Sequence, residues 1–312
     1  MKRSFGVDGL AVDAGSVLTV GTFDGVHLGH QAIIRYLVER ARIQGGRSVV
    51  VSFDPHPREV VHGEAVPLLT TLEERAAELE ALGLDGFVVL PFTPAFARLS
   101  PSAFIEEVLV RHIGLQEIVI GYDHGFGRGR SGGREDLERL GRKHGFSVDV
   151  IPGQVVAEHV VSSTQVRRQL LDGGAVKDAA RLLGRYYSLA GTVVLGSQRG
   201  RTLGYPTANL SVNHPRKVVP AEGVYAVNAR VSGEASRMGG MMNIGTRPTF
   251  DGEDTRLEVH LFDVSRDLYG QELRVEFVER IRPEVRFDSV EALKKQLSKD
   301  RARCMAALKV LT

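Results

Sequence analysis

The stretch Val20-Gly21-Thr22-Phe23-Asp24-Gly25-Val26-His27-Leu28-Gly29-His30 decides the fold of the first half of the chain. The apolar, β-branched run 16–20 precedes it and predicts a buried strand. Apolar residues recur after it at positions 33, 34, 37, 38 and 41, so we expect a helix to begin near His30. A strand, a glycine-rich turn and a helix start form an anion site, because the first N–H groups of a helix lack intrahelical partners.

Three glycines and two histidines give this turn its chemical character. Gly21, Gly25 and Gly29 allow sharp turns and a close approach of the backbone to a ligand. His27 and His30 are spaced so that both imidazoles can face one phosphate, where they would stabilise charge on a phosphorus atom under attack. The structural alternative is that one histidine caps the helix and the other satisfies a loop. The strand before the turn and the helix after it favour the phosphate interpretation.

The composition is that of an ordinary globular protein with room for two domains. The chain has 312 residues, of which 43% are hydrophobic and 25% charged, with a formal net charge of +2 and one cysteine. Domains of about 150 residues predict two such units, and no apolar run reaches the roughly 18 residues that span a bilayer. The N-terminus lacks the apolar core of a signal peptide, and one cysteine allows no internal disulfide, so we expect a cytoplasmic location. The small net charge gives little support to a nucleic-acid partner.

Short apolar strands alternate with helical stretches over residues 6–183, which predicts a parallel sheet with helices on both faces. The strand 48–53 leads to His56, which two flanking prolines would hold at the carboxyl edge of the sheet, where ligands bind. The alternative is an ordinary proline-stiffened loop. A glycine-rich loop at 121–133 follows another strand and carries Asp123 and Arg128, the arginine suited to substrate phosphates. Further expected elements are a helix at 72–82, a strand at 86–90, a loop at 94–99, a helix at 102–113 and a strand at 117–120.

A second phosphate-binding element ends the first half. Ser162 and Gln165 have the spacing of a capping box, which by itself indicates only a well-formed helix start. Three hydroxyls, those of Ser162, Ser163 and Thr164, stand at that start with Arg167 one turn later. A helix N-terminus with hydroxyls and a guanidinium is suited to a triphosphate, and this function is compatible with capping.

The second half has a different pattern. After Arg185, strands of period two alternate with glycine and proline turns, which predicts a small antiparallel barrel or sandwich. The expected strands are 188–195, 224–231, 239–244, 255–263 and 272–281. A final helix, with a capping box at Asp288 and Glu291, is expected to pack on this domain.

The segment Gly200-Arg201-Thr202-Leu203-Gly204-Tyr205-Pro206-Thr207-Ala208-Asn209-Leu210 stands out within the second half. Thr207 and Asn209 alternate, so in an extended chain their oxygens point the same way. A hydroxyl and an amide oxygen could hold Mg²⁺ together with substrate phosphates, because Mg²⁺ takes hard oxygen ligands. By composition alone, the segment is a turn-rich hairpin loop.

Taken together, these motifs resemble two known families. The stretch 27–30 resembles the HxGH signature of nucleotidylyltransferases, and 162–167 resembles the ISSTxxR element that accompanies it. The segment 200–209 resembles the GxxxGYPTAN signature of riboflavin kinases, whose two downstream motifs resemble 243–250 and 257–261. The order of the halves resembles that of the bacterial bifunctional riboflavin kinase/FAD synthetase family.

The resemblance implies a Rossmann-like FMN adenylyltransferase domain at 1–184 and a β-barrel riboflavin kinase domain with a terminal helix at 185–312. In the first, the phosphate of FMN attacks the α-phosphate of ATP and pyrophosphate leaves, with His27 and His30 stabilising the transition state. In the second, Glu258 is the base that takes the proton of the ribityl 5′-hydroxyl as it attacks the γ-phosphate of ATP, and Thr207 and Asn209 hold Mg²⁺. The implied nucleotide- and phosphate-binding residues are Gly21, Phe23, Gly25, Gly29, Ser162, Ser163, Thr164, Arg167, Gly204, Thr207 and Asn209. Candidates for flavin or loop contacts are His56, Asp123, Arg128, Asn243 and Arg247.

Two alternatives remain at this point. One is a riboflavin kinase whose N-terminal domain is inactive, and the other is a nucleic-acid-binding module, suggested by the arginines at 128, 130, 134, 139 and 142 and by Lys143. Acidic residues interleave with those arginines, which favours a solvated helix face. His124 stands where the family often has an aromatic residue, which affects the expected recognition of flavin or adenine. The expected partners are riboflavin, FMN and ATP, with no nucleic acid and no membrane, and the oligomeric state is left undetermined.

Overall fold

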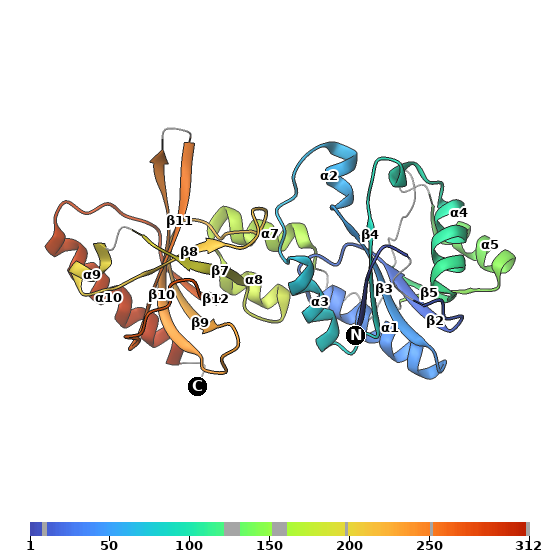
Figure 1. The fold of residues 1–312 in the computed structure, drawn as a ribbon, viewed down its shortest axis with the longest axis horizontal. Helices are drawn as coiled ribbons and strands as arrows, with labels where there is room; N and C mark the ends of the chain where they lie inside the picture. Colours follow the sequence, from blue (N-terminus) through green and yellow to red (C-terminus); the bar gives the residue numbers. More distant parts are fainter. Residues whose placement is uncertain (8–10, 122–131, 152–160, 197–198, 250–251, 310–312) are drawn as a thin grey trace. The chain divides into compact units, whose positions relative to one another are not determined.

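The structure, a computed structural model, describes residues 1–7, 11–121, 132–151, 161–196, 199–249 and 252–309 (Figure 1). The chain divides into two compact units, Met1–Ser163 and Thr164–Thr312, called here the first and the second unit. The predicted functional boundary at Gly184 stays a prediction, and the segment between the two positions clusters with the second unit.

The first unit is built on a six-stranded sheet in the order β1-β4-β3-β2-β5-β6, in which all neighbours are parallel. The strands are β1 (Lys2–Phe5), β2 (Ser16–Val20), β3 (Arg47–Asp54), β4 (Gly86–Pro91), β5 (Leu115–Ile120) and β6 (Ser147–Val150). The chain adds β3 and β4 on one side of β2 and then places β5 on the other side. Ligands of open α/β sheets bind where the strand order reverses in this way, off the carboxyl ends of the strands. The glycine-rich turn leaves β2 at that point.

Helices cover both faces of this sheet, as the sequence predicted (Figure 1). They are α1 (Leu28–Ile43), α2 (Pro57–His62), α3 (Leu72–Ala81), the 3₁₀ turn η1 (Phe96–Arg98), α4 (Pro101–Ala103), the π-helix η2 (Phe104–Ile113) and α5 (Arg134–His144). One core lies between the sheet and η2 with α5, and the other between the sheet and α1 with α3. Within β2, Leu18 enters the first core and Val17 the second, because successive side chains of a strand point to opposite faces.

Three elements of the first unit were not predicted: β1, α2 and β6. Strand β1 reads Lys-Arg-Ser-Phe and buries only Ser4, so its sequence carries no apolar pattern. The expected loop at 94–99 contains η1, and the helix expected from 102 begins at Pro101 and continues as a π-helix. These differences leave the sheet edge that carries the glycine-rich turn as predicted.

The second unit contains a closed barrel in the order β10-β11-β8-β7-β12-β9, with antiparallel neighbours. Its strands are β7 (Ser188–Val194), β8 (Ala208–Val212), β9 (Gly223–Val231), β10 (Met238–Thr249), β11 (Gly252–Leu261) and β12 (Glu272–Arg282). The predicted barrel is confirmed. The hairpin loop expected at 200–210 is instead a short helix, α9 (Arg199–Leu203), followed by β8.

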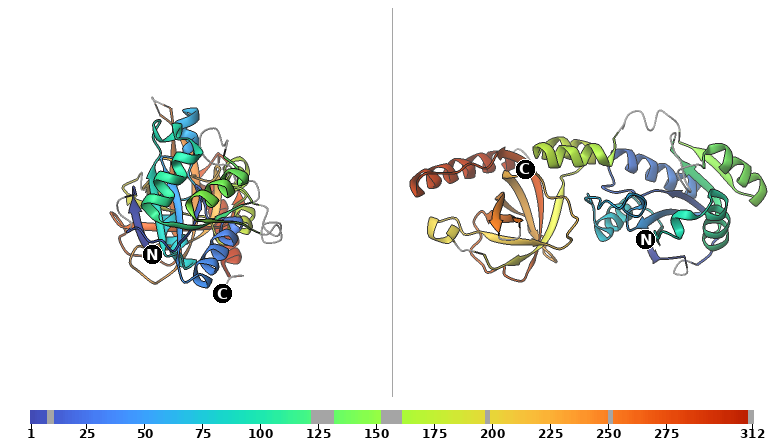
Figure 2. Two further views of the ribbon diagram at one scale, coloured as in Figure 1. Left: turned by 90° about the vertical axis from the view of Figure 1, so that its right-hand side faces the viewer. Right: turned by 90° about the horizontal axis from the view of Figure 1, so that it is seen from above.

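Three longer helices pack on the barrel: α7 (Ser163–Gly173), α8 (Val176–Leu183) and α10 (Val290–Lys309). Helix α10 runs along β9, β10 and β12 and shares a buried cluster with them, as expected for the terminal helix (Figure 2). The carbonyl of Leu170 in α7 accepts a hydrogen bond from the N–H of Ala221 at 2.9 Å. Lys177 of α8 lies 2.6 Å from the carboxylate of Glu279 on β12. Within the described residues, no helix is both long and apolar enough to cross a membrane.

Candidate active sites

The two histidines of the first unit lie at the start of α1. The helix begins at Leu28, slightly earlier than predicted, and His27 is its N-cap. The Nδ1 atom of His27 accepts a hydrogen bond from the N–H of His30 at 3.3 Å. The capping alternative is therefore correct for His27. Because Nδ1 accepts a hydrogen bond, the neutral ring carries its proton on Nε2 and can donate there to a further acceptor.

The rings of His27 and His30 are stacked, with centroids 3.6 Å apart and planes at 18°. The ring of Phe23 lies 5.0 Å from that of His30. The Nδ1 atom of His30 is buried and has no hydrogen-bond partner among the described residues. Burial, followed by the proximity of His27 and of Arg75, holds the pKa of His30 well below its ordinary value of 6.5. His30 is therefore neutral at pH 7, and the stacked pair can offer hydrogen bonds to a phosphate without carrying two charges.

The backbone of the turn is strained. Phe23 has a φ of 49° and Val26 a φ of 40°, and both side chains are buried in the core beside α1. Positive φ is unusual for residues other than glycine, and it is a true outlier for a β-branched residue such as valine. Gly25, between them, has a φ of 84°. At Gly21 a Cβ atom would lie 2.9 Å from the ring of Phe23, so only glycine fits without a shift. Strain of this kind persists where surrounding structure enforces it, and it clusters at functional sites.

One residue of the second phosphate element, Ser163, contacts the glycine-rich turn within the first unit. The hydroxyl of Ser163 donates a hydrogen bond to the carbonyl oxygen of Asp24 at 2.8 Å, although the two residues are 139 positions apart. Ser162 and Ser163 belong to the first unit, whereas Thr164 and Arg167 lie on α7 in the second unit. The capping box proposed for Ser162 and Gln165 stays a prediction.

The other first-unit candidates are less informative. His56 follows β3, as expected, and its Nδ1 accepts a hydrogen bond from the N–H of Arg58 at 3.1 Å, so it caps α2. Asp123, His124 and Arg128 lie outside the described residues. Gly29 is in the first turn of α1.

The candidate base of the second unit lies in a row of polar side chains across three strands. In the strand register Glu258 of β11 pairs with Asn209 of β8 on one side and with Asn243 of β10 on the other. Directly paired residues of antiparallel strands point to the same face, with Cβ atoms about 4.5–5.5 Å apart. The flanking Leu257 and Val259 are buried and point to the opposite face. One carboxylate and two amides therefore share a half-buried face of the barrel.

Glu258 stands apart from the charged side chains that the structure describes. Arg256 and His260 share its face by strand alternation, as predicted, but Glu258 makes no ion pair or hydrogen bond with any described residue. The Nδ1 of His260 instead contacts the carbonyl oxygen of Pro206 at 2.8 Å, and its ring packs between those of Tyr205 and Phe262. The carboxylate therefore has no competing charged partner among the described residues.

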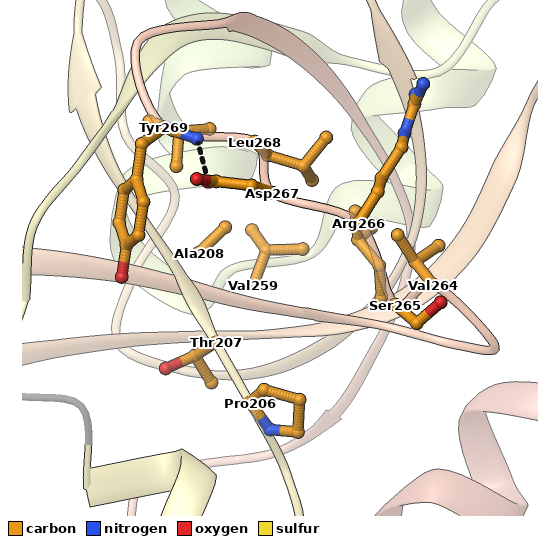
Figure 3. A pocket seen from close by; sticks show the side chains of 12 residues that line it. Pro206, Thr207, Ala208, Val259, Val264, Ser265, Arg266, Asp267, Leu268 and Tyr269 are labelled. Atoms are coloured by element: carbon orange, nitrogen blue, oxygen red, sulfur yellow. Dashed lines mark hydrogen bonds between the residues drawn. The ribbon is translucent and has the colours of Figure 1, made fainter.

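A cavity of about 430 Å³ lies beside Thr207 (Figure 3). It is lined by the segment 264–269 and by apolar side chains of the barrel, namely Val193, Ala208, Val259 and Leu261. Figure 3 shows Pro206 and Thr207 on one side of this space and Asp267, Leu268 and Tyr269 on another, with the N–H of Tyr269 bonded to Asp267 at 2.9 Å. No motif of the sequence pointed to 264–269, because its proximity to Thr207 exists only in the folded barrel.

Two glycines shape the backbone near Asn209. Gly204 has a φ of 83°, a conformation that favours glycine. A Cβ atom at Gly196 would lie 2.0 Å from the amide of Asn209, so this backbone passes directly against that side chain. Arg247 lies on β10 opposite Asp254, and its side chain is outside the described part of the structure. Among the described residues no group of three His, Cys, Asp or Glu side chains forms a metal cluster.

Comparisons with known proteins agree with this division into two sites. A family model described as FAD synthetase matches residues 10–165, and one described as riboflavin kinase matches residues 183–308. A bifunctional riboflavin kinase/FMN adenylyltransferase of Listeria monocytogenes is 40% identical over 92% of this chain and 91% of its own length. The protein of the same name from Escherichia coli K12 is 40% identical over 96% of each chain.

One solved structure is similar over nearly the whole length. A Streptococcus pneumoniae protein described as a macrolide-efflux protein is 34% identical to this chain, with a TM-score of 0.84 over 94% of each chain. A pair of units of this kind therefore occurs in an experimentally determined structure.

Proposed function

The chain belongs to the family of bifunctional riboflavin kinases/FMN adenylyltransferases, and from this premise we propose how its two sites divide the work. The chain phosphorylates riboflavin to FMN and adenylylates FMN to FAD, with ATP as co-substrate in both steps. We assign FMN adenylylation to the first unit and riboflavin phosphorylation to the barrel. The observation that carries this assignment is that the histidine pair lies in the first compact unit, whereas Glu258 with its two flanking asparagines lies in the second.

In the first unit, an oxygen of the FMN phosphate attacks the α-phosphorus of ATP, and the bond to the pyrophosphate oxygen breaks. Negative charge builds on the oxygens of the α-phosphate, where preorganised donors act most strongly. His27 supplies its Nε2–H as a donor, and His30 supplies a neutral imidazole. The stacking of the two rings and the hydrogen bond from the N–H of His30 to His27 hold both side chains in place. Gly21, Gly25 and Gly29 bring the backbone close to the triphosphate, with Ser162, Ser163, Thr164 and Arg167 as its further ligands. Phe23 contributes by packing against His30.

In the barrel, the ribityl 5′-oxygen of riboflavin attacks the γ-phosphorus of ATP, and the bond to the ADP oxygen breaks. The hydroxyl proton goes to Glu258, a half-buried carboxylate that forms no competing ion pair with any described residue. Asn209 and Asn243 flank it in the strand register and can orient substrate oxygens. We propose that ATP binds along the face that carries Asn209 and Glu258, with Gly204 shaping its approach.

The donors present fit a magnesium ion. Thr207 and Asn209 offer a hydroxyl and an amide oxygen, which are hard, neutral ligands of the kind that Mg²⁺ accepts alongside substrate phosphates. Bound there, the ion would neutralise charge on the β- and γ-phosphates of ATP. His56, Asp123, Arg128 and Arg247 stay proposals for flavin or loop contacts. The cytoplasmic location and the absence of nucleic-acid and membrane partners also stay predictions from the sequence.

One incubation tests both activities. The purified full chain is given riboflavin, ATP and Mg²⁺, and the flavins are separated by chromatography. We expect FMN to form first and FAD to follow, and supplied FMN to yield FAD and pyrophosphate directly. FMN without FAD would support the alternative of a riboflavin kinase with an inactive first domain. No FMN at all would contradict the assignment of the barrel.

A further inference from the structure

A buried polar network lies directly beneath the glycine-rich turn. Its members are Asp24 of the turn, Thr70, and Arg75 of α3, whose exposed fractions are 0%, 4% and 3%. None of the motifs recognised in the sequence includes Thr70 or Arg75. Charged side chains are almost never this deeply buried unless they are paired, so the network calls for a physical explanation.

Asp24 and Thr70 join the turn to the segment that leads into α3. The carboxylate of Asp24 accepts hydrogen bonds from the N–H of Leu69 at 3.0 Å and from the N–H of Thr70 at 2.9 Å. The hydroxyl of Thr70 donates to the same carboxylate at 3.0 Å and accepts from the N–H of Gly25 at 2.9 Å. Thr70 therefore holds both the side chain of Asp24 and the backbone of Gly25.

Arg75 completes the network from the other side. Its guanidinium lies 3.6 Å from the Asp24 carboxylate, 3.4 Å from the hydroxyl of Ser52 and 3.4 Å from the carbonyl oxygen of Thr70. Ser52 in turn donates to the carbonyl oxygen of Thr22 at 3.2 Å. The guanidinium thus links β3, α3 and the turn.

A buried ion pair is a poor source of stability, because the cost of desolvation offsets much of the attraction. Apolar side chains of similar volume often stabilise the fold equally well. Its presence here coincides with the backbone strain on both sides of Asp24, at Phe23 and Val26. Strained residues keep their conformation only where neighbouring structure enforces it. His27 and His30 follow this strained segment directly, so their placement depends on its shape.

We propose that Asp24, Thr70 and Arg75 form a positioning network for FMN adenylylation, which fixes the turn so that both imidazoles face the α-phosphate. This inference rests on the proposed role of His27 and His30. Arg75 is a positioning residue and touches no substrate in this account. It has a second effect through its charge. The pKa of His30 is lowered by burial, by His27 of the turn and by the charge of Arg75 on α3, and this keeps the His30 ring neutral.

The test compares matched variants in the full-length enzyme. Arg75→Met removes the charge and Arg75→Lys keeps it, while Thr70→Val removes the hydroxyl and Thr70→Ser keeps it. Arg40→Met is the control, because Arg40 bonds the buried Glu117 at 2.8 Å in the same unit near the far end of α1. The riboflavin kinase activity of each variant reports the amount of working barrel, and thermal unfolding reports whether the first unit stays folded.

We expect Arg75→Met and Thr70→Val to lower kcat for FAD synthesis about 10²-fold, the usual size of a small misplacement of catalytic groups. The KM for ATP should change little, because the loss falls on the transition state. Thr70→Ser should keep most of the turnover. Arg40→Met should lower the unfolding temperature and leave kcat unchanged.

The pH dependence of kcat distinguishes a positioning role of Arg75 from a purely structural role. Loss of the Arg75 cation in Arg75→Met should raise the pKa of His30. The imidazole of His30 then becomes protonated at a higher pH than in the wild type. The acid limb of kcat should therefore move to higher pH in Arg75→Met and stay in place in Arg75→Lys. Thr70→Val, which keeps the cation, should lower kcat without moving that limb.

Three outcomes would overturn the inference. The first is wild-type turnover for FAD synthesis in both Arg75→Met and Thr70→Val. The second is a loss of kcat in Arg40→Met as large as that in Arg75→Met. The third is an acid limb of the kcat profile that stays in place in Arg75→Met. His30→Ala distinguishes this failure from failure of the proposed function. If His30→Ala loses FAD synthesis while the network variants keep it, only the positioning network is wrong. If His30→Ala keeps FAD synthesis, the role of the histidines is itself wrong.

Discussion

His27 combines a structural and a chemical contribution in one side chain. Its Nδ1 caps α1 by accepting the N–H of His30, and that hydrogen bond leaves the ring proton on Nε2. The capping and the phosphate interpretations, which the sequence presented as competing, are therefore compatible. The two histidines differ in their hydrogen bonds, because the Nδ1 of His30 has no partner among the described residues and the pKa of His30 is depressed.

We predict that His27→Ala and His30→Ala each lower FAD synthesis about 10²–10³-fold, the usual effect of losing one donor to a developing oxyanion. ATP affinity and FMN synthesis should change little. His27→Ala should also lose about 1 kcal/mol of stability, because it removes a helix cap. Steady-state kinetics of both reactions, combined with thermal unfolding, measure these effects separately. Normal FAD turnover per folded molecule in the double variant would contradict the assignment.

Glu258 provides the corresponding test in the barrel. Because it forms no ion pair with any described residue, its removal should cost little stability. We predict that Glu258→Ala lowers riboflavin kinase turnover about 10²–10⁴-fold, the range for a lost general base. FAD formation from supplied FMN serves as the internal control and should continue. Kinase turnover near that of the wild type would show that another group accepts the proton.

At the scale of elements, the terminal helix is held to the barrel by a charged contact as well as by apolar packing. Asp300 of α10 is fully buried, and Arg282 of β12 lies 2.8 Å from its carboxylate. Gln296 donates to the other carboxylate oxygen at 2.8 Å. The capping box expected at Asp288 and Glu291 is wrong, because the helix begins at Val290 and the hydroxyl of Ser289 accepts a hydrogen bond from the N–H of Ala292 at 3.1 Å.

We predict that Asp300→Ala destabilises the barrel by about 3–5 kcal/mol, because it leaves the Arg282 guanidinium without its buried partner. The matched control is the next residue of the same helix. Arg301→Met removes an exposed ion pair with Asp263, which should contribute about 0–1 kcal/mol. Urea unfolding of both variants measures the difference. Equal stability of the two variants would mean that α10 is held by apolar contacts alone.

At the scale of the whole molecule, the arrangement of α7 and α8 bears on where the chain can be divided. Both helices cluster with the barrel, through the hydrogen bond from Ala221 to Leu170 and the ion pair of Lys177 with Glu279. Arg280 of the barrel also donates to the carbonyl oxygen of Gly173 at 3.0 Å. The second compact unit therefore begins before the predicted functional boundary at Gly184.

We predict that fragments 164–312 and 185–312 both make FMN and neither makes FAD, because the histidine pair lies in the first unit. The longer fragment should be the more stable, since it keeps the contacts of α7 and α8. Flavin analysis and thermal unfolding of the two fragments measure this directly. A folded 164–312 fragment that fails to phosphorylate riboflavin would contradict the division of activities.

The sequence by itself determined the features that depend on neighbouring residues. The period-two pattern after Arg185 predicted a barrel, and the alternation before it predicted a parallel sheet with helices on both faces. The order of strand, glycine-rich turn and helix placed His27 and His30 at the carboxyl edge of β2. Local periodicity and turn chemistry are sufficient for such predictions, because they act within a few residues.

Only the tertiary structure decided which distant residues meet. The hydrogen bond of Ser163 to Asp24 depends on chain closure over many residues, and the row of Asn209, Glu258 and Asn243 depends on strand register. Arg75 reads in the sequence as one polar residue of an amphipathic helix, yet it is buried beneath the turn. The physical reason is that burial and register are set by the packing of whole elements against each other, and no local pattern of residues records that packing.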